Sequence, residues 1–165
     1  ESYGYLVGDF VRDKDAIIST SIICEIASWA KKQSKNLMDI LDDIYDKYGI
    51  FKNKLYTIKL EGIDGRKNIN KIMKDFRTDP PNLIFNMKTK EIIDYSKKNN
   101  NKIINEKANV IQFITKNNSS ITVRPSGTEP KIKFYFSLNS KILSHKKIEE
   151  LINKEIEIIK KKYAK

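Results

Sequence analysis

The spacing of apolar residues changes once along the chain, near residue 50. Before that point, apolar residues recur at intervals of three and four, which is typical of helices that pack by one face. The spacing predicts one helix from Asp15 to about Gln33 and another from about Leu37 to Tyr48, with Gly49 as a stop signal. Apart from the opening segment, no strand pattern accompanies these helices. Their apolar faces therefore predict a packing partner that this chain lacks.

After residue 50 the pattern is that of a sheet with helices. Strand-like runs occur at residues 55–60, 92–95, 110–114, 121–123 and 131–136. One helical pattern ends at Asp79-Pro80-Pro81, a second begins at about Ser144, and the polar tract from Ser96 to Asn101 predicts an exposed loop. These elements predict an α+β module in which two helices cover one face of a mainly antiparallel sheet.

Length and composition narrow the class of protein. A chain of 165 residues can form one domain with a real core, or a small domain plus a piece of another. The single cysteine, Cys24, excludes a disulfide framework, and its apolar helical surroundings predict burial. No apolar run approaches the roughly 18 to 20 residues that span a bilayer, and no segment has the pattern of a signal peptide. We therefore expect a cytoplasmic protein that does not bind membranes.

The formal net charge of +11, from 32 Lys and Arg against 21 Asp and Glu, raises the possibility of a nucleic-acid partner. The distribution of the lysines argues against it. They are spread among Asn and Ile residues, and no basic stripe is interleaved with stacking aromatic side chains. We expect no nucleic-acid partner. The only histidine, His145, lies at a predicted helix start, where a solvated surface position is expected.

The segment from Arg124 to Tyr135 combines turn residues with strand alternation. Pro125 fixes its own φ angle, Gly127 permits a positive φ, and Pro130 ends the turn without a free amide. Such a turn can direct several backbone N–H groups to one point, which is an arrangement that binds anions without a metal. After the turn, the alternation predicts that lysines face one side of a strand and apolar residues the other.

The side chains of this segment suit a phosphate group. Ser126 and Thr128 offer hydroxyl donors, Arg124 offers a planar fork of N–H groups, and Lys131 and Lys133 offer compact charges. An ordinary hairpin turn with solvated lysines fits the same residues. The residues alone leave both interpretations open.

The string RPSGTEPKIKFY at 124–135 resembles the phosphate-binding loop in the last domain of the α-D-phosphohexomutases, the phosphoglucomutase and phosphomannomutase superfamily. The chain start, Glu1 to Leu6 followed by Val11 to Ala16, is similar to the end of that family's sugar-recognition loop and to the basic helix entry behind it. The resemblance implies that residues 1–50 are the mostly helical tail of the sugar-binding α/β domain and that residues 51–165 are the C-terminal phosphate-binding domain. It also implies a hinge around Gly49 to Lys54 and a chain that is a fragment of a longer protein.

The enzymes resembled here interconvert hexose 1-phosphate and hexose 6-phosphate through a phosphoserine and a bisphosphorylated sugar, with Mg²⁺ bound. The resemblance assigns the loop to the substrate phosphate that is not reacting. The phosphate-binding positions are Arg124, Ser126, Gly127, Thr128 and Lys133, and the sugar-binding positions are Glu1, Ser2 and Lys14. Glu129 is expected to orient a neighbouring lysine or amide. Lys131 lies outside the matched set and faces either phosphate or solvent.

Two parts of the family's chemistry have no match in this chain. We find no segment that would hold a phosphoserine and no Asp-x-Asp-x-Asp cluster that would hold Mg²⁺, so catalytic and metal residues are expected in missing N-terminal domains of the same polypeptide. The fragment is expected to be inactive alone. Hexose 1,6-bisphosphate is the expected intermediate and activator, and sugar phosphates are the expected partners. The alternatives are a phosphopentomutase of the same superfamily, a non-catalytic phosphate-binding module and a basic nucleic-acid-binding domain; the choice among glucose, mannose and pentose stays open because the sugar loop is cut at Glu1.

Overall fold

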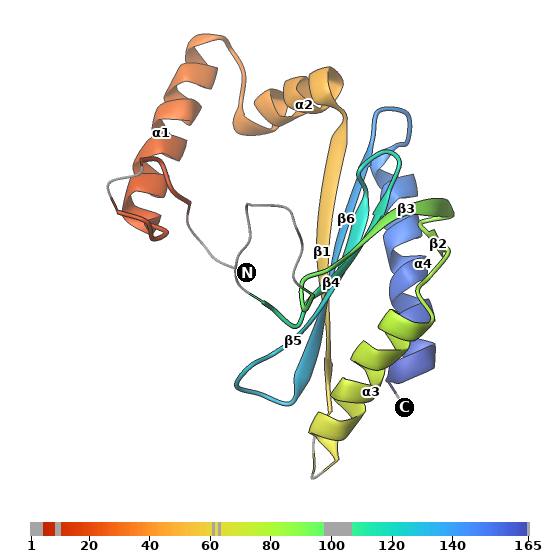
Figure 1. Ribbon diagram of the computed structural model, residues 1–165. Helices are drawn as coiled ribbons and strands as arrows, with labels where there is room; N and C mark the ends of the chain where they lie inside the picture. Colours follow the sequence, from red (N-terminus) through yellow and green to blue (C-terminus); the bar gives the residue numbers. More distant parts are fainter. Residues whose placement is uncertain (1–4, 9–10, 61, 63, 98–106, 165) are drawn as a thin grey trace. The chain divides into compact units, whose positions relative to one another are not determined.

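The computed structural model describes residues 5–8, 11–60, 62, 64–97 and 107–164, and the chain divides into two compact units, Glu1–Tyr48 and Gly49–Lys165 (Figure 1). Part of the predicted loop at 96–101 therefore lies outside the described residues. None of the helices in the described ranges combines the length and apolarity needed to cross a bilayer. The assignment of residues 1–50 to a preceding domain stays a prediction.

The first unit contains two helices, α1 (Ala16–Lys32) and α2 (Leu37–Tyr48). The carboxylate of Asp15 caps α1 by accepting hydrogen bonds from two N–H groups of the first turn, at 2.7 and 3.1 Å. At the start of α2, the Asn36 side chain accepts from the N–H of Asp39 at 3.1 Å, and the Asp39 carboxylate accepts from the N–H of Asn36 at 2.7 Å. The two predicted helices are confirmed. Local capping and apolar spacing both favour a helix in each segment.

The apolar residues of these helices are largely exposed. In α1 only Ala30 is buried, and in α2 no residue is. Trp29 is 54% exposed and Met38 is 63% exposed. The thiol of Cys24 is exposed as well, so the prediction that it is buried was wrong. The apolar neighbours that suggested burial lie on a helix that buries a single position.

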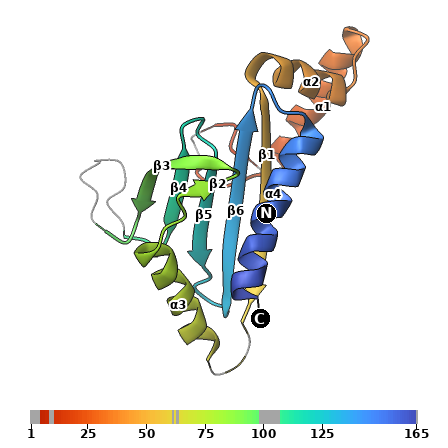
Figure 2. The same cartoon turned by 90° about the vertical axis from the view of Figure 1, so that its right-hand side faces the viewer.

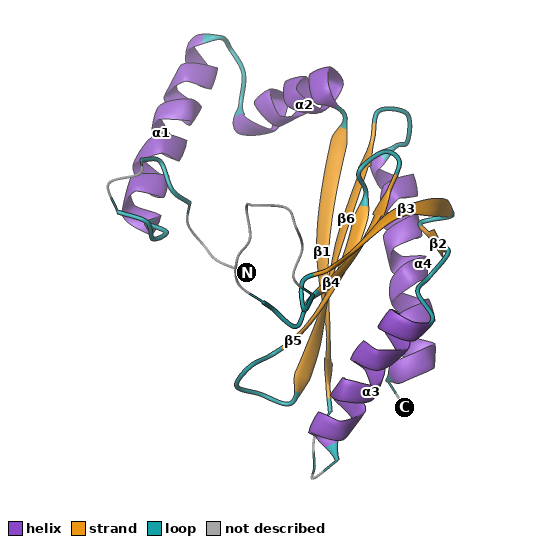
Figure 3. Ribbon diagram, viewed as in Figure 1, coloured by secondary structure: helices purple, strands orange, loops and turns teal. Residues whose placement is uncertain are grey.

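The second unit is built on a six-stranded antiparallel sheet with the strand order β1-β6-β5-β4-β3-β2 (Figures 1 and 3). Its strands are β1 (Ile50–Lys59), β2 (Leu83–Ile84), β3 (Met87–Asp94), β4 (Ile111–Thr115), β5 (Ser120–Pro125) and β6 (Lys131–Ser140). Strands β3 to β6 follow one another as sequential neighbours, whereas β1 joins the sheet beside β6, the last strand in sequence. The predicted α+β class and antiparallel sheet are confirmed.

Two helices, α3 (Gly65–Thr78) and α4 (His145–Tyr163), lie on the same face of this sheet (Figures 1 and 2). Strand β6 alternates between buried and partly exposed residues, and its buried side chains face the helices. The ring of Phe76 on α3 packs against Phe113 and Phe134 with centroid distances of 5.8 and 5.9 Å. The core therefore lies between the sheet and these helices, as the alternation at 131–136 predicts.

The first strand is longer than predicted. It begins at Ile50, which lies opposite Ser140, and it pairs with β6 along all ten of its residues. Its first half is rich in Lys and Asn, which obscures the strand pattern, but the long β6 supplies hydrogen-bonding partners for it. Of the predicted hinge from Gly49 to Lys54, only Gly49, with a φ of 95°, stays outside the strand.

Strand β2 and the first part of β3 were not predicted. They form a hairpin whose two turn residues, Phe85 and Asn86, have φ angles of 53° and 60°. Positive φ at both positions is typical of the tight turns that match strand twist, although a bulky residue such as Phe seldom adopts it. The N–H of Phe85 donates to the Glu155 carboxylate of α4 at 2.7 Å. A contact 70 residues away along the chain thus supports the turn, and no local pattern predicts it.

Candidate functional site

The loop predicted to bind phosphate joins β5 to β6 at one end of the sheet (Figure 1). The N–H of Ser126 donates to the carbonyl oxygen of Lys131 at 2.8 Å, and the N–H of Lys131 donates to the carbonyl of Glu129 at 2.8 Å. The Ser126 hydroxyl oxygen accepts from the N–H of Glu129 at 3.4 Å. These bonds fix the shape of the turn. The Ser126 amide is used by the turn itself, so only its hydroxyl group is left for a ligand.

Arg124 and Lys133 lie directly opposite each other on β5 and β6. Their neighbours Val123 and Phe134 are fully buried on the helix side, so Arg124 and Lys133 face the other side of the sheet. The Arg124 side chain is exposed, and the described part of the chain gives its guanidinium group no hydrogen-bond or ion-pair partner. Arg124 and Lys133, which are nine residues apart in the sequence, thus lie side by side at the base of the loop.

The tip of the loop offers two backbone donors. Among the described residues, the N–H groups of Gly127 and Thr128 have no hydrogen-bond partner, and both residues are exposed. Gly127 does not have the positive φ that the sequence suggested. A Cβ atom added at Gly127 would meet no atom within 4 Å. Glycine here leaves open space above the backbone, where a ligand can approach the amides.

Glu129 forms an ion pair with Lys131. The hydrogen bond from Lys131, followed by the charge of that lysine, holds the pKa of the Glu129 carboxyl below its usual range, and the charges of Lys59 and Lys133 act in the same direction. An acidic residue in this loop is therefore compensated by the surrounding lysines. The expectation that Glu129 orients a neighbouring lysine agrees with this ion pair, and Lys131 faces the carboxylate.

The chain-start positions are a separate case. Glu1 and Ser2 lie outside the described residues. Lys14 lies in the first unit, just before α1, and its ammonium group is 3.5 Å from the carboxylate of Asp13. Its side chain is 52% exposed, so it is accessible. The structure thus gathers five of the eight predicted site residues in one hairpin, and Lys14 belongs to the other compact unit.

One basic residue near the loop was not predicted from the sequence. Lys59, the last residue of β1, lies directly opposite Lys131. The neighbouring Leu60 donates its N–H to the carbonyl oxygen of Pro130 at 2.9 Å, which attaches the end of β1 to the end of the loop. The register between β1 and β6, which are far apart in the sequence, cannot be read from apolar alternation, so no signal in the sequence identified Lys59.

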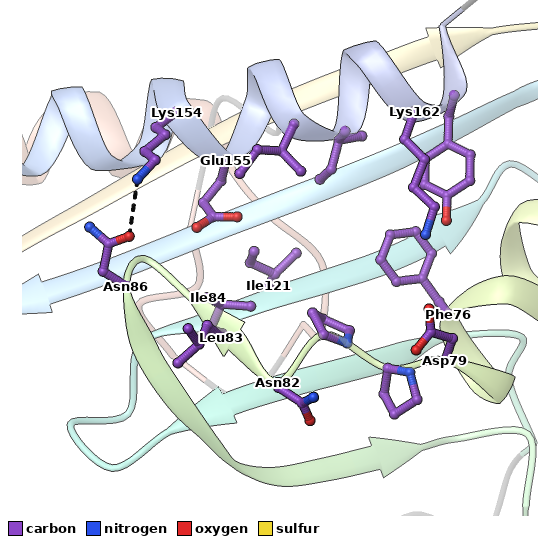
Figure 4. Close-up of a pocket in the computed structure, with 15 residues that line it drawn as sticks. Phe76, Asp79, Asn82, Leu83, Ile84, Asn86, Ile121, Lys154, Glu155 and Lys162 are labelled. Atoms are coloured by element: carbon purple, nitrogen blue, oxygen red, sulfur yellow. Dashed lines mark hydrogen bonds between the residues drawn. The ribbon is translucent and has the colours of Figure 1, made fainter.

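A cavity of about 420 Å³ lies away from the loop, between α4, the end of α3 and strand β2 (Figure 4). Its walls are mainly apolar, with Ile84, Ile121 and Ile159 among them, and none of the predicted phosphate-binding residues lines it. At its edge, Lys154 donates to the side chain of Asn86 at 3.2 Å. The cavity is therefore separate from the loop between β5 and β6.

Comparison with known proteins gives a consistent result. Residues 84–154, which include the loop, match the family model of the "phosphoglucomutase/phosphomannomutase, C-terminal domain". A phosphoglucomutase of Staphylococcus aureus strain bovine RF122 / ET3-1 is 43% identical over 146 residues, which cover 84% of this chain and 26% of that protein. The phosphoglucomutase of strain N315 is 42% identical over the same shares.

Among solved structures, the open form of pp63/parafusin, a Paramecium phosphoprotein described as a phosphoglucomutase, superposes with a TM-score of 0.60. The match covers 94% of this chain and 29% of that chain, at 19% sequence identity. At this level of identity the likeness shows the fold alone.

The antiparallel sheet and the two helices on one of its faces define an α+β domain with the fold of that structural neighbour. The chain belongs to the α-D-phosphohexomutase superfamily, and it carries the C-terminal domain of that family. It spans about a quarter of the length of the curated relatives that it matches.

Proposed function

We propose that this chain is part of a phosphoglucomutase or phosphomannomutase that interconverts hexose 1-phosphate and hexose 6-phosphate. In this proposal, the loop between β5 and β6 binds the phosphate group that is not reacting. One observation carries it: Arg124 and Lys133 face each other at the base of a loop whose tip presents the unpartnered amides of Gly127 and Thr128. The function named for the Staphylococcus aureus relatives supports the choice of reaction.

Each donor of the loop has a distinct role in this proposal. The guanidinium group of Arg124 can donate to two phosphate oxygens at once, and Lys133 adds a compact charge beside it. The amides of Gly127 and Thr128 and the Thr128 hydroxyl group can donate to the remaining oxygens. A phosphate held in this way does not react. Its binding energy aligns the distant sugar hydroxyl with the reacting group, which is how remote contacts raise the rate.

The phosphoserine and Mg²⁺ are proposed for the longer parent protein. In the described ranges, no group of three Asp, Glu, His or Cys side chains could hold a metal ion, so we assign no metal ligand to this chain. Mg²⁺ bound in the parent would neutralise charge on the phosphoryl group in transfer. Hexose 1,6-bisphosphate is the proposed intermediate. By itself, the chain would bind phosphate without turning over substrate.

Lys14, with Glu1 and Ser2, is proposed for recognition of the sugar, on the resemblance of the chain start to the family's sugar loop. Carboxylate and hydroxyl groups accept hydrogen bonds from sugar hydroxyl groups, and an exposed lysine can donate to them. The proposed partners are sugar phosphates and the remaining domains of the same polypeptide. The proposed location is the cytoplasm.

Replacing Arg124 in the full-length parent tests this function. Arg124→Ala removes the bidentate donor, and we expect kcat/KM for the hexose phosphate to fall by about 10-fold to 1,000-fold, because phosphate binding energy is lost in the transition state. The control is Lys116→Ala, since Lys116 is exposed in the turn at the opposite end of β5. Steady-state kinetics of both variants give the comparison. Unchanged kinetics in Arg124→Ala would contradict the phosphate-site assignment.

A further inference from the structure

Lys59 shares the sheet face of the candidate phosphate site. In the pairing of β1 with β6, Lys59 lies opposite Lys131, and Thr57, two residues earlier, lies opposite Lys133. Residues directly opposite in an antiparallel pair point to the same face, and so do residues two apart on one strand. Lys59, Lys131, Lys133 and Arg124 therefore point to the same side of the sheet, in two adjacent rows.

Two like-charged pairs are stacked at this end of the sheet. Lys59 faces Lys131, and Arg124 faces Lys133. Directly opposite side chains have Cβ atoms about 5 Å apart, where like charges repel each other and destabilise the sheet. A bound anion would reduce the repulsion between cations that face each other in this way. Several cations on one face can interact favourably with a doubly charged group.

The one carboxylate of the loop, that of Glu129, is engaged by Lys131. Glu129 forms its ion pair with Lys131, and the described residues give Lys59 no ion-pair partner. Lys59 is exposed, so its ammonium group is accessible from solvent. Its backbone is also fixed relative to the loop, because the next residue, Leu60, donates its N–H to Pro130 at 2.9 Å. Lys59 is thus a positioned cation without an ion-pair partner among the residues that the structure describes.

We propose that Lys59 is a further substrate-binding residue, which contacts the same phosphate group as Arg124 and Lys133 from outside the loop. The proposal rests on the proposed function of the loop and extends the site onto β1. Its ligand is the phosphate dianion of a sugar phosphate. Lys59 and Lys131 face each other, and Lys131 forms an ion pair with Glu129. Of these two lysines, Lys59 is therefore the one that is available to the ligand.

The test is a titration of the 165-residue chain with inorganic phosphate, followed by the amide resonances of Gly127 and Thr128. The variants are Lys59→Gln, Lys59→Arg, Arg124→Gln and the control Lys116→Gln, which makes the same change in net charge at the far end of β5. Lys59→Gln is expected to weaken phosphate binding by about threefold to tenfold. Lys59→Arg is expected to keep binding within about twofold of wild type, because it preserves the charge. An unchanged spectrum outside the loop confirms that each variant folds.

The outcomes separate this proposal from the proposed function. If Lys59→Gln binds phosphate as wild type does while Arg124→Gln does not, the role of Lys59 is overturned and the loop assignment stands. Equal losses in Lys59→Gln and Lys116→Gln would show an effect of net charge alone, which also overturns it. If Arg124→Gln binds as wild type does, or if wild type gives no response, the loop is not the phosphate site and both proposals fail.

Discussion

Glu155 is a carboxylate that the fold buries between α4 and the β2–β3 turn, with only 9% of the residue exposed. Burial raises the pKa of its carboxyl group, and the hydrogen bond from the N–H of Phe85 and the charge of Lys154 offset this only in part. The bond from Phe85 holds a turn with two positive φ angles. The Glu155 carboxylate therefore stabilises the turn through this hydrogen bond, whereas the burial of its negative charge is unfavourable.

The pH dependence of stability tests this account of Glu155. Its folded pKa lies above the reference value of 4.5, so its contribution to the free energy of unfolding is greatest below that value and falls as pH rises through the folded pKa. Glu155→Gln keeps an oxygen for the N–H of Phe85 and has no charge to bury. We expect the variant to gain stability relative to wild type between about pH 4 and pH 7.

Urea unfolding of both proteins at the two pH values measures this gain. Glu157→Gln is the matched control, because Glu157 lies on the same helix with its side chain 55% exposed. A stability difference between Glu155→Gln and wild type that is the same at both pH values would contradict the assignment of a raised pKa.

At the scale of elements, α3 is fastened to strand β3 by a charged contact. The Nε atom of Arg77 donates to the Asp94 carboxylate at 3.1 Å, and an Nη2–H donates to the side chain of Asn109 at 2.8 Å. The Asp94 side chain is only 11% exposed. Burial alone would raise its pKa, but the hydrogen bonds from Arg77 and Ser96 outweigh burial, and the pKa of Asp94 is lowered.

Removing Arg77 should therefore loosen the attachment of α3. Arg77→Met leaves Asp94 charged and largely buried without its main partner, and we expect a loss of about 1 to 3 kcal/mol in the free energy of unfolding near neutral pH. The lowered pKa means that the contribution of Asp94 is complete above its reference value of 3.8 and is lost as pH falls through its folded pKa. The difference between variant and wild type should shrink in strong acid.

Chemical denaturation at both conditions provides the measurement, with Arg66→Met as the control because Arg66 is an exposed residue of the same helix. A loss in Arg77→Met no larger than that in the control would mean that the contact with Asp94 does not hold α3 to the sheet.

At the scale of the whole molecule, the sequence predicts well wherever local signals act together. The alternation at 131–136 identifies which face of β6 is buried, and Asp15 and Ser144 mark helix starts that the structure confirms. The loop between β5 and β6 is also found at its predicted place, since both flanking strands have strong patterns. In these segments, local spacing and tertiary packing favour the same structure.

The features that the sequence did not predict depend on partners far along the chain. The first half of β1 forms a strand because β6 is long enough to pair with it, and the turn at Phe85 depends on Glu155 of α4. Cys24 is exposed although its apolar neighbours suggested burial. Lys59 lies beside Lys131 only because of the register of β1 with β6. Long-range register and packing cannot be deduced from the local pattern of one sequence.

The central claim, that the loop between β5 and β6 binds a phosphate group, is tested most directly by an NMR titration of this chain with glucose 1,6-bisphosphate and, in parallel, with inorganic phosphate. We expect both ligands to shift the amide resonances of Ser126, Gly127 and Thr128, even at millimolar affinity, because the donors come from one preformed hairpin. No shift with either ligand, or shifts spread evenly over lysine-rich surfaces such as Lys160 to Lys162, would contradict it.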